Sequence, residues 1–372
     1  MPNSNLFPNR YIKPCTTSAG PDPVAELQRQ LITLRYQFVQ DQRKQGQSVA
    51  ELQNATVEIG FNEFDRPGLG RAYIGGGHSW KGRHVGVDKF RFHSETINPI
   101  AAKLPSPIIR HAGVASFTRG YWCGGYTGAR GSRLNQQVIF RIDFHTEVTA
   151  LQGQTLQQPT SYARGAQSDT AGYIGGRHKQ SSPEIPESGE IQKLDFGAES
   201  TSVLAQTLPR VQSGSNAAWS QEKAYFAGGW TRTREIDSMT FATESTASVS
   251  AELSSGRLRG GNFHSPIKGY FSGGVKAPGE PGPLFLRSVD ALDFASESTY
   301  VVARAQLSNH SVDCEGAGSS YKGYHFSHHY KGAAEGSDIH AVDGLNFTTE
   351  RMWQISARLT FGGAYCAPVY RP

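Results

Sequence analysis

The segment YHFSHHYKG, residues 324–332, places His325, His328 and His329 close together in the chain. Imidazole is a common transition-metal ligand, so this density raises the question of a metal site. No carboxylate or cysteine stands at a suitable spacing beside these histidines, so we expect no tightly bound metal and no cofactor. A solvent-facing or interface loop making specialised contacts is the favoured interpretation, and a ligand-contacting segment is the alternative.

A carboxylate recurs along the chain in the pattern Phe-x-x-Glu, which occurs six times. Such an acid could serve as a general acid or base in each copy. A structural role is favoured instead, in a turn or in a hydrogen bond between neighbouring repeats, because Ser and Thr follow the Glu and suit a tight turn. The six acids are Glu95, Glu147, Glu199, Glu244, Glu297 and Glu350.

The same repeats carry a tyrosine followed by glycines, as in YFAGG at 225–229. The six tyrosines are Tyr73, Tyr121, Tyr173, Tyr225, Tyr270 and Tyr324. The spacing from each Phe to the next Tyr is almost constant. The spacing from Tyr to Phe varies, from the short interval Tyr225–Phe241 to the long interval Tyr270–Phe294. Half of each unit is therefore constant, and the other half contains a variable loop.

The repeat recurs about every 50 residues, is rich in Gly and aromatic residues and is poor in helical pattern, which predicts an all-β fold, a six-bladed β-propeller with one four-stranded blade per repeat. We expect the Tyr-containing strands to lie nearest the axis. Glycine at their ends allows close approach of backbones and positive φ in the following turn.

Ring closure is predicted from the end of the chain. The C-terminal segment ISARLTFGGAYCAP resembles SSGRLRGGNFHSP at 254–266, which precedes a repeat tyrosine. We expect a C-terminal strand to complete the first blade, so that no sheet edge is left open. The alternative is that ATVEIGF at 55–61 supplies this strand.

The segment 1–60 differs from the repeats. Asp22 and Pro23 predict a helix start and Gly46 its end, after an extended Pro- and Asn-rich arm. Apolar residues recur in this helix with alternating spacings of three and four, which is the pattern of a short heptad seam. We therefore expect residues 1–60 to be a docking or oligomerisation segment and residues 61–372 to be the propeller. A helix docked on the propeller itself is equally compatible. The seam consists of Val24, Leu27, Leu31, Leu34 and Phe38.

Composition excludes several classes of protein. The net charge of +5 over 372 residues is mild, and the basic residues are scattered, so no nucleic-acid partner is expected. The four cysteines lack the spacing of a zinc site or a disulfide framework, and buried free thiols are expected. No apolar run approaches the length of a membrane-spanning helix, and the N-terminus lacks the order of a signal peptide.

The repeat unit resembles a known group. KGYFSGG at 268–274, followed by VDALDFASEST at 289–299, is similar to the kelch-like repeats of structural proteins in tailed bacteriophages, including cyanophage tail fibres. The later Tyr–Trp pair of kelch repeats is missing. The resemblance covers about residues 65–372 and implies a non-enzymatic virion protein, assembled in the host cytoplasm. Residues 1–60 would contact other virion proteins or sister copies, and propeller loops would contact a host receptor or glycan.

Two other functions belong to different classes. A cellular kelch-type protein-interaction module would be a soluble monomer with a groove for its partner. A carbohydrate-active or copper-oxidase propeller would need ordered catalytic residues. Cys123 stands beside Tyr121, but no arrangement of two Tyr, two His and a Cys matches a copper site of that kind. We therefore expect no enzymatic activity.

Overall fold

The computed structural model describes residues 70–79, 82–127, 134–178, 180–181, 184–185, 187–210, 213–328 and 338–371. The predicted arm, the helix with its seam, and the boundary at residues 60 and 61 lie outside these residues. Within the described part, no helix is long and apolar enough to cross a membrane.

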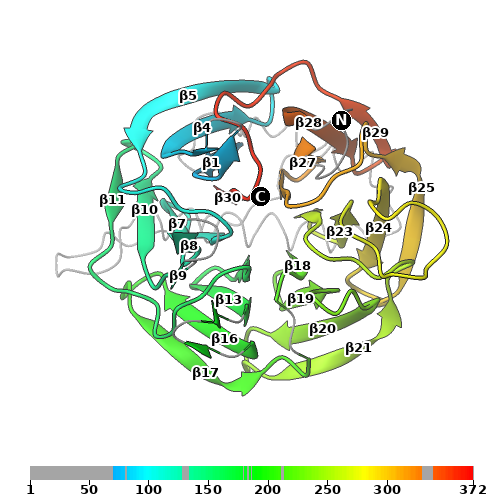
Figure 1. Cartoon of the computed structure of the whole chain (residues 1–372), viewed down its shortest axis with the longest axis horizontal. Helices are drawn as coiled ribbons and strands as arrows, with labels where there is room; N and C mark the ends of the chain where they lie inside the picture. Colours follow the sequence, from blue (N-terminus) through cyan, green and yellow to red (C-terminus); the bar gives the residue numbers. More distant parts are fainter. Residues whose placement is uncertain are drawn as a thin grey trace, which may run out of the picture. The chain divides into compact units, whose positions relative to one another are not determined.

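Six four-stranded antiparallel sheets are arranged around an axis, which confirms the predicted six-bladed β-propeller (Figure 1). From the axis outward, the blades are β30-β1-β4-β5, β6-β7-β10-β11, β12-β13-β16-β17, β18-β19-β20-β21, β22-β23-β24-β25 and β26-β27-β28-β29. We number them one to six in this order.

The strands of each layer share a position in the repeat. The innermost strands are β30 (Ala367–Tyr370), β6 (Ala112–Ala115), β12 (Arg164–Gln167), β18 (Asn216–Trp219), β22 (Gly261–His264) and β26 (Glu315–Gly318). The second strands are β1 (Arg71–Gly75), β7 (Arg119–Cys123), β13 (Ala171–Arg177), β19 (Lys223–Ala227), β23 (Lys268–Ser272) and β27 (Lys322–His328).

The third strands are β4 (Gly86–Arg91), β10 (Ile139–Asp143), β16 (Ser188–Asp195), β20 (Glu235–Thr240), β24 (Ser288–Asp293) and β28 (Asp338–Asn346). The outer strands are β5 (Thr96–Lys103), β11 (Thr149–Leu151), β17 (Thr201–Thr207), β21 (Thr246–Glu252), β25 (Thr299–Gln306) and β29 (Arg351–Gln354).

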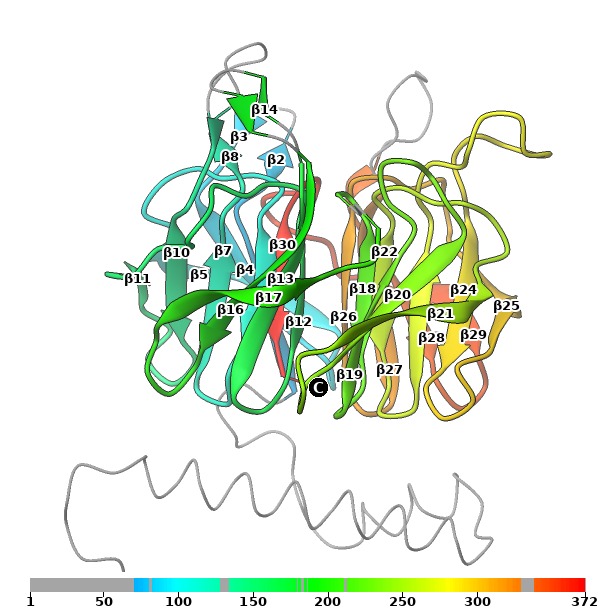
Figure 2. The same cartoon turned by 90° about the horizontal axis from the view of Figure 1, so that it is seen from below.

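Three small hairpins join second to third strands in blades one to three. They are β2 (His78–Ser79) with β3 (Gly82–Arg83), β8 (Tyr126–Thr127) with β9 (Leu134–Asn135), and β14 (Gln180–Ser181) with β15 (Glu184–Ile185). Figure 2 shows β2, β3, β8 and β14 together above one end of the blades, where the β23–β24 loop also emerges. We call this side the hairpin face; it carries the variable Tyr-to-Phe interval of the sequence.

The prediction that the Tyr-containing strands lie nearest the axis was wrong, because these are the second strands. The innermost strands have small residues where blades converge. A Cβ on Gly113 would lie 2.2 Å from the carbonyl oxygen of Pro368, and one on Gly165 would lie 2.1 Å from that of Gly113. Such crowding excludes a tyrosine ring, which finds room between blades one strand further out.

Blade one is built from both ends of the described chain. The C-terminal strand β30 pairs antiparallel with β1, with Tyr73 opposite Val369, and so forms the innermost strand of this blade. Val369 and Tyr73 are both fully buried. The C-terminal strand therefore closes the ring by the ordinary pairing that the other five blades use within one repeat.

Each pair of neighbouring blades is joined by the repeated Tyr, Phe and Glu. The buried tyrosine of one blade stacks on the Phe of the next, with ring centroids 5.2–5.6 Å apart and planes within 9–21°. Its hydroxyl donates to the Glu of the same Phe-x-x-Glu motif, at 2.8–3.4 Å. The pairs are Tyr73–Glu147, Tyr121–Glu199, Tyr173–Glu244, Tyr225–Glu297, Tyr270–Glu350 and Tyr324–Glu95.

A cation and an uncommon backbone geometry complete each of these six contacts, which we call the blade joints. Lys223, for example, lies 2.8 Å from Glu297, and every other joint has a Lys or Arg within 2.6–2.9 Å of its Glu. All six glutamates adopt the left-handed conformation, with φ of 49–55°. This conformation is unfavourable for a side chain with a Cβ, so the contacts of the carboxylate must outweigh its cost.

Closure by β30 predicts a difference between two Val-to-Asp substitutions. Val369→Asp should lower the free energy of unfolding by several kcal/mol, because a carboxylate would be buried without a partner where the ring closes. Val203→Asp, on the outer strand of blade three with 40% of the residue exposed and opposite the neutral Gln192, should change it by less than about 0.5 kcal/mol. Chemical denaturation measures both. Equal stabilities would show that the ring does not depend on β30.

The blade joints predict a coupling that depends on pH. A double-mutant cycle with Tyr225→Phe and Glu297→Gln should give a coupling energy on the order of 1 kcal/mol at pH 7, since a hydroxyl donates to a carboxylate that is partly screened by water. The hydrogen bond from Lys223 lowers the pKa of Glu297 below the ordinary 4.5. Its stabilisation is therefore present above pH 4.5 and should be lost as pH falls through the lowered pKa. A coupling unchanged at pH 3 would contradict a role for the ionised carboxylate.

Candidate binding face around the axis

Six residues on the hairpin face form a closed ring of backbone hydrogen bonds around the axis. They stand just ahead of the six innermost strands, and each N–H donates to the carbonyl of the preceding member at 2.8–2.9 Å. All six have φ between 57° and 67°. We call them the axial ring: Arg110, Tyr162, Gly214, Arg259, Asp313 and Tyr365.

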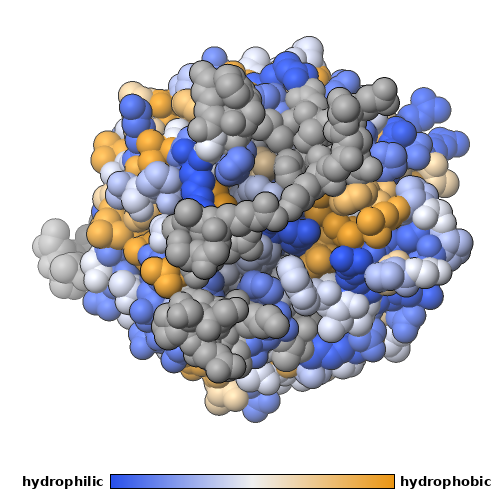
Figure 3. Space-filling view, viewed as in Figure 1, coloured by the Kyte–Doolittle hydropathy of each residue, from blue (hydrophilic) through white to orange (hydrophobic). Residues whose placement is uncertain are grey.

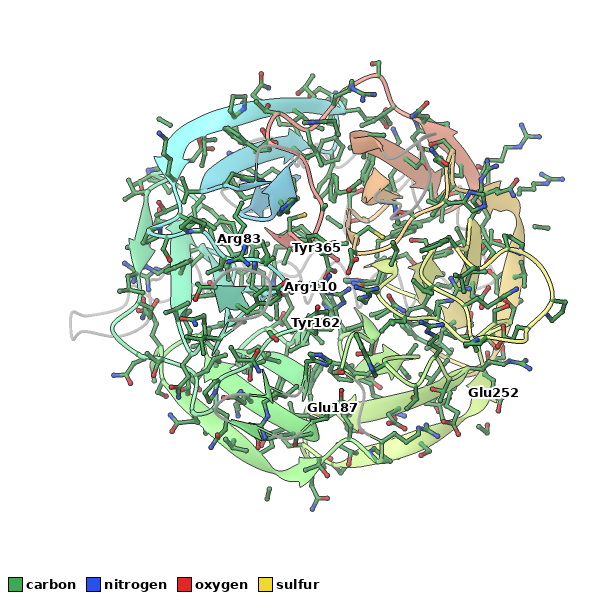
Figure 4. All side chains as sticks on the ribbon, viewed as in Figure 1. Arg83, Arg110, Tyr162, Glu187, Glu252 and Tyr365 are labelled. Carbon is green, nitrogen blue, oxygen red and sulfur yellow. The ribbon has the colours of Figure 1, made fainter. Side chains whose placement is uncertain are left out.

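Only one member of the axial ring is a glycine, although the left-handed conformation favours glycine. For the other five residues the left-handed conformation costs about 1 kcal/mol or more each, so the surrounding structure must impose this conformation. The cyclic bonding supplies that constraint, because every member both donates to one neighbour and accepts from the other. Figure 4 shows three members of the ring, Arg110, Tyr162 and Tyr365, close together near the axis.

Arg110 is the central side chain of this ring. Its guanidinium carbon lies 3.9 Å from the ring centroid of Tyr162 and 4.1 Å from that of Tyr365, between the two aromatic faces. Its Nη1 lies 2.8 Å from Asp313, which also lies 3.0 Å from Arg259. Burial alone would lower the pKa of Arg110, but the attraction of Asp313 raises it. The mouth of the axis is therefore occupied by a fixed, charged arginine.

A second ion pair lies in the same pocket. Arg164 of blade three pairs with Glu315 of blade six, and its Nε donates to the carbonyl oxygen of Ser215 at 2.8 Å. Burial raises the pKa of Glu315 to about 7, and the attraction of Arg164 opposes this rise. Cys314 also lines the pocket, and burial raises its pKa to about 12. At neutral pH this thiol is protonated, so it is a poor nucleophile.

Aromatic residues fill the other end of the axis. Trp219, His264 and Tyr370 end the innermost strands of blades four, five and one, and all three are buried. The Trp219 ring lies 4.0 Å from His264 and 5.8 Å from Tyr370, between centroids. Burial lowers the pKa of His264 to about 3, so it is neutral at pH 7. Charged side chains thus fill one end of the axis and aromatic side chains the other.

Aromatic rings extend from the axial ring toward the hairpins. Tyr162 stacks on Tyr126 at 6.0 Å and contacts His178 at 4.6 Å, and His178 contacts Trp230 at 4.5 Å, all between centroids. We call Tyr126, Tyr162, His178 and Trp230 the aromatic cluster. Trp230 is 40% exposed, whereas Tyr126 and Tyr162 are buried. The cluster therefore presents one indole to solvent on a base of packed rings.

Among His325, His328 and His329, the structure describes the side chain of His325 alone. His325 is fully buried rather than solvent-facing, because it takes the position after the repeat tyrosine, which is a core residue in the other five blades. Its Nδ1 is bonded to Ser272 at 2.8 Å and its Nε2 to Ser311 at 2.7 Å. His328 ends β27, and its side chain and all of His329 lie outside the described residues. Within the described part, no three His, Cys, Asp or Glu residues are placed to hold a metal.

Sequence reasoning missed the axial ring and the aromatic cluster. A signal existed, since the first five ring members each stand at the same distance ahead of a repeat tyrosine, as Arg110 does ahead of Tyr121. Their types vary from Arg to Gly to Asp, however, so the shared feature is a backbone conformation. The seam residues predicted to bind a partner lie outside the described residues, and the repeated Tyr and Glu form the blade joints.

The axial ring predicts a large effect of removing one charge. Asp313→Asn should lower the free energy of unfolding by about 3 kcal/mol, because Arg110, which is 8% exposed, would lose its counter-ion. Asn also tolerates a left-handed backbone, so the change tests the charge and not the conformation. Thermal and urea unfolding measure it, with Glu222→Gln, at an exposed position, as the control. A variant as stable as the parent would show that Arg110 does not need this partner.

Comparisons with known proteins find a similar fold in solved structures, but no matching family model or curated protein sequence. Among solved structures, YjhT superposes with a TM-score of 0.60 at 9% sequence identity, over 79% of this chain and 100% of that one. At this identity the likeness concerns the fold alone. The chain is thus a kelch-like six-bladed β-propeller, similar in architecture to the kelch-repeat protein YjhT.

Proposed function

We propose that this chain is a non-enzymatic structural protein of a bacteriophage particle, a tail fibre, adaptor or receptor-binding component. Its residues 1–60 dock on other virion proteins or on sister copies. Its propeller presents the hairpin face to a partner outside the particle. The resemblance of the repeat unit to phage structural proteins is the starting point of this proposal.

The main support for this proposal is the contrast between the propeller body, where the same contact recurs between all blades, and one face, where the connections differ. The hairpins of blades one to three and the β23–β24 loop leave from the same side (Figure 2). The blade joints beneath them are the same six times, which favours a rigid platform. Recognition commonly resides in loops held by such a scaffold.

The axis supports a binding role over a catalytic one. Arg110 and Arg259 share Asp313, and Arg164 is paired with Glu315, so the titratable groups of these pairs engage one another. The buried Cys314 is held as a thiol by its raised pKa. The groups nearest the axis thus stabilise the axial ring, and the side chains around this ring are the ones available to contact a partner.

The docking role of residues 1–60 predicts a loss of assembly without a loss of folding. Replacing Leu31 and Leu34 by Asp should abolish incorporation into particles, because carboxylates would be buried in an apolar seam. Thr33→Asp with Gln40→Asp adds the same charge on the opposite side of the predicted helix and should assemble normally. Quantitative immunoblots of purified particles measure incorporation, and circular dichroism checks the propeller.

Normal assembly of the seam variant would refute docking through this segment. If the chain is also found as a monomer outside particles, a cellular interaction module becomes the better account. Loss of assembly in both variants would show that charge, and not the seam, controls incorporation, which would equally contradict the proposal.

A further inference from the structure

The exposed indole of Trp230 is held in a fixed orientation. Its ring lies 4.5 Å from that of His178 and 6.1 Å from that of Tyr162, with the latter plane at 87°. The guanidinium carbon of Arg259 lies 5.9 Å from its centroid. Contacts with two rings and a cation therefore orient the indole, while 40% of the residue stays accessible.

The backbone that carries Trp230 is also constrained. Gly229 has φ of 122°, and the N–H of Arg232 donates to its carbonyl at 2.7 Å, closing a tight turn. Arg232 has φ of 55°, and its Nη1 donates to the carbonyl of Lys276 at 3.2 Å. Little conformational freedom is left to lose when a ligand arrives, which favours binding.

Charged groups of both signs lie around the indole. Arg259 lies 3.0 Å from Asp313, and His178 lies 3.1 Å from Glu187. Single-stranded nucleic acids bind aromatic residues inside a groove of positive charge that follows the phosphates. Here the carboxylates of Asp313 and Glu187 lie among the cations and would repel phosphates, so the site does not favour a polyanion.

We propose that the aromatic cluster binds a pyranose ring of a neutral saccharide, with Trp230 as the surface on which the sugar stacks. This inference rests on the proposed display of the hairpin face. One face of a pyranose presents C–H groups, which carry partial positive charge and match the negative π face of an indole. The Glu187 carboxylate and the Arg259 guanidinium, 27% and 21% exposed, supply an acceptor and a donor for sugar hydroxyls.

This combination is the one that saccharides need, namely an apolar platform with a few oriented polar groups beside it. A purely apolar partner would make no hydrogen bond with Glu187 or Arg259 beside the indole. The hairpin face in Figure 3 has hydrophilic atoms beside the axis, and its broad hydrophobic area lies elsewhere, over β23 and β24. Leu284 in the β23–β24 loop provides an internal control, since it is 47% exposed and lies outside the aromatic cluster.

The test uses the full chain and three neutral oligosaccharides, maltohexaose, cellohexaose and chitohexaose, with the oligonucleotide dT6 as the polyanion. Titration calorimetry and tryptophan fluorescence should show binding of at least one oligosaccharide and weaker or no binding of dT6. Trp230→Ala should weaken saccharide binding by about tenfold or more, equivalent to about 1.4 kcal/mol. Trp230→Phe, which keeps a ring, should retain most of the affinity, and Leu284→Ala should retain all of it.

Three results would overturn the inference: none of the oligosaccharides binds, Trp230→Ala binds as tightly as the parent, or dT6 binds more tightly than any sugar. Unfolding curves of both Trp230 variants establish that they are folded. Trp230→Ala should still enter particles, because the seam and not the cluster would control docking. Failed sugar binding with normal incorporation therefore contradicts only this inference, whereas normal incorporation of the seam variant contradicts only the proposed function.

Discussion

The blade joint is the contact on which the rest of the propeller depends. A ring of six sheets closes only if every pair of neighbours meets at nearly the same angle. The Tyr–Phe stack fixes the spacing between blades, and the hydroxyl-to-carboxylate bond fixes their relative tilt. Because the carboxylate also accepts a bond from a Lys or Arg, it is held in place from the blade that supplies the tyrosine. Six copies of one contact thus set the geometry of the whole ring.

This geometry determines what can occupy the axis. Near the centre the blades are so close that backbone meets backbone, and Gly113 and Gly165 have no room for a side chain. Large side chains meet one another near the axis at the two ends of the innermost strands. At one end they are Trp219, His264 and Tyr370, and at the other the axial ring with Arg110 at its centre. The axis is therefore part of the core, and the exposed chemistry lies around it.

The sequence predicted the features that recur as residue types. Tyr, Phe and Glu repeat at regular positions because each takes part in the same contact, so the number of blades followed from counting them. It did not place the tyrosine strands correctly, since nothing in YFAGG distinguishes a first strand from a second. The close approach of small residues, which decides the order, is visible only when blades are side by side.

The axial ring and His325 show two further limits of sequence reasoning. The ring is a shared backbone conformation carried by different side chains, so its members do not look alike in the sequence. His325 was predicted to lie in a solvent-facing or interface loop because other histidines stand beside it in the sequence. Alignment with Ile74 and Phe271, which are buried at the same place in their repeats, indicates a core position instead. The seam at residues 24–38 stays a prediction.

The pairing of β30 with β1 bears on how the chain acquires its fold during synthesis. Residues 71–75 emerge from the ribosome long before their partner at 367–370 is translated. Until then β1 has an unsatisfied edge, and blades two to six can form only as an open arc. Contacts between segments so distant in sequence form slowly, and open edges recruit other chains. The nascent protein is thus vulnerable to aggregation until residues 367–370 have been translated, and a premature stop shortly before them would produce a nearly complete propeller with a permanently open edge.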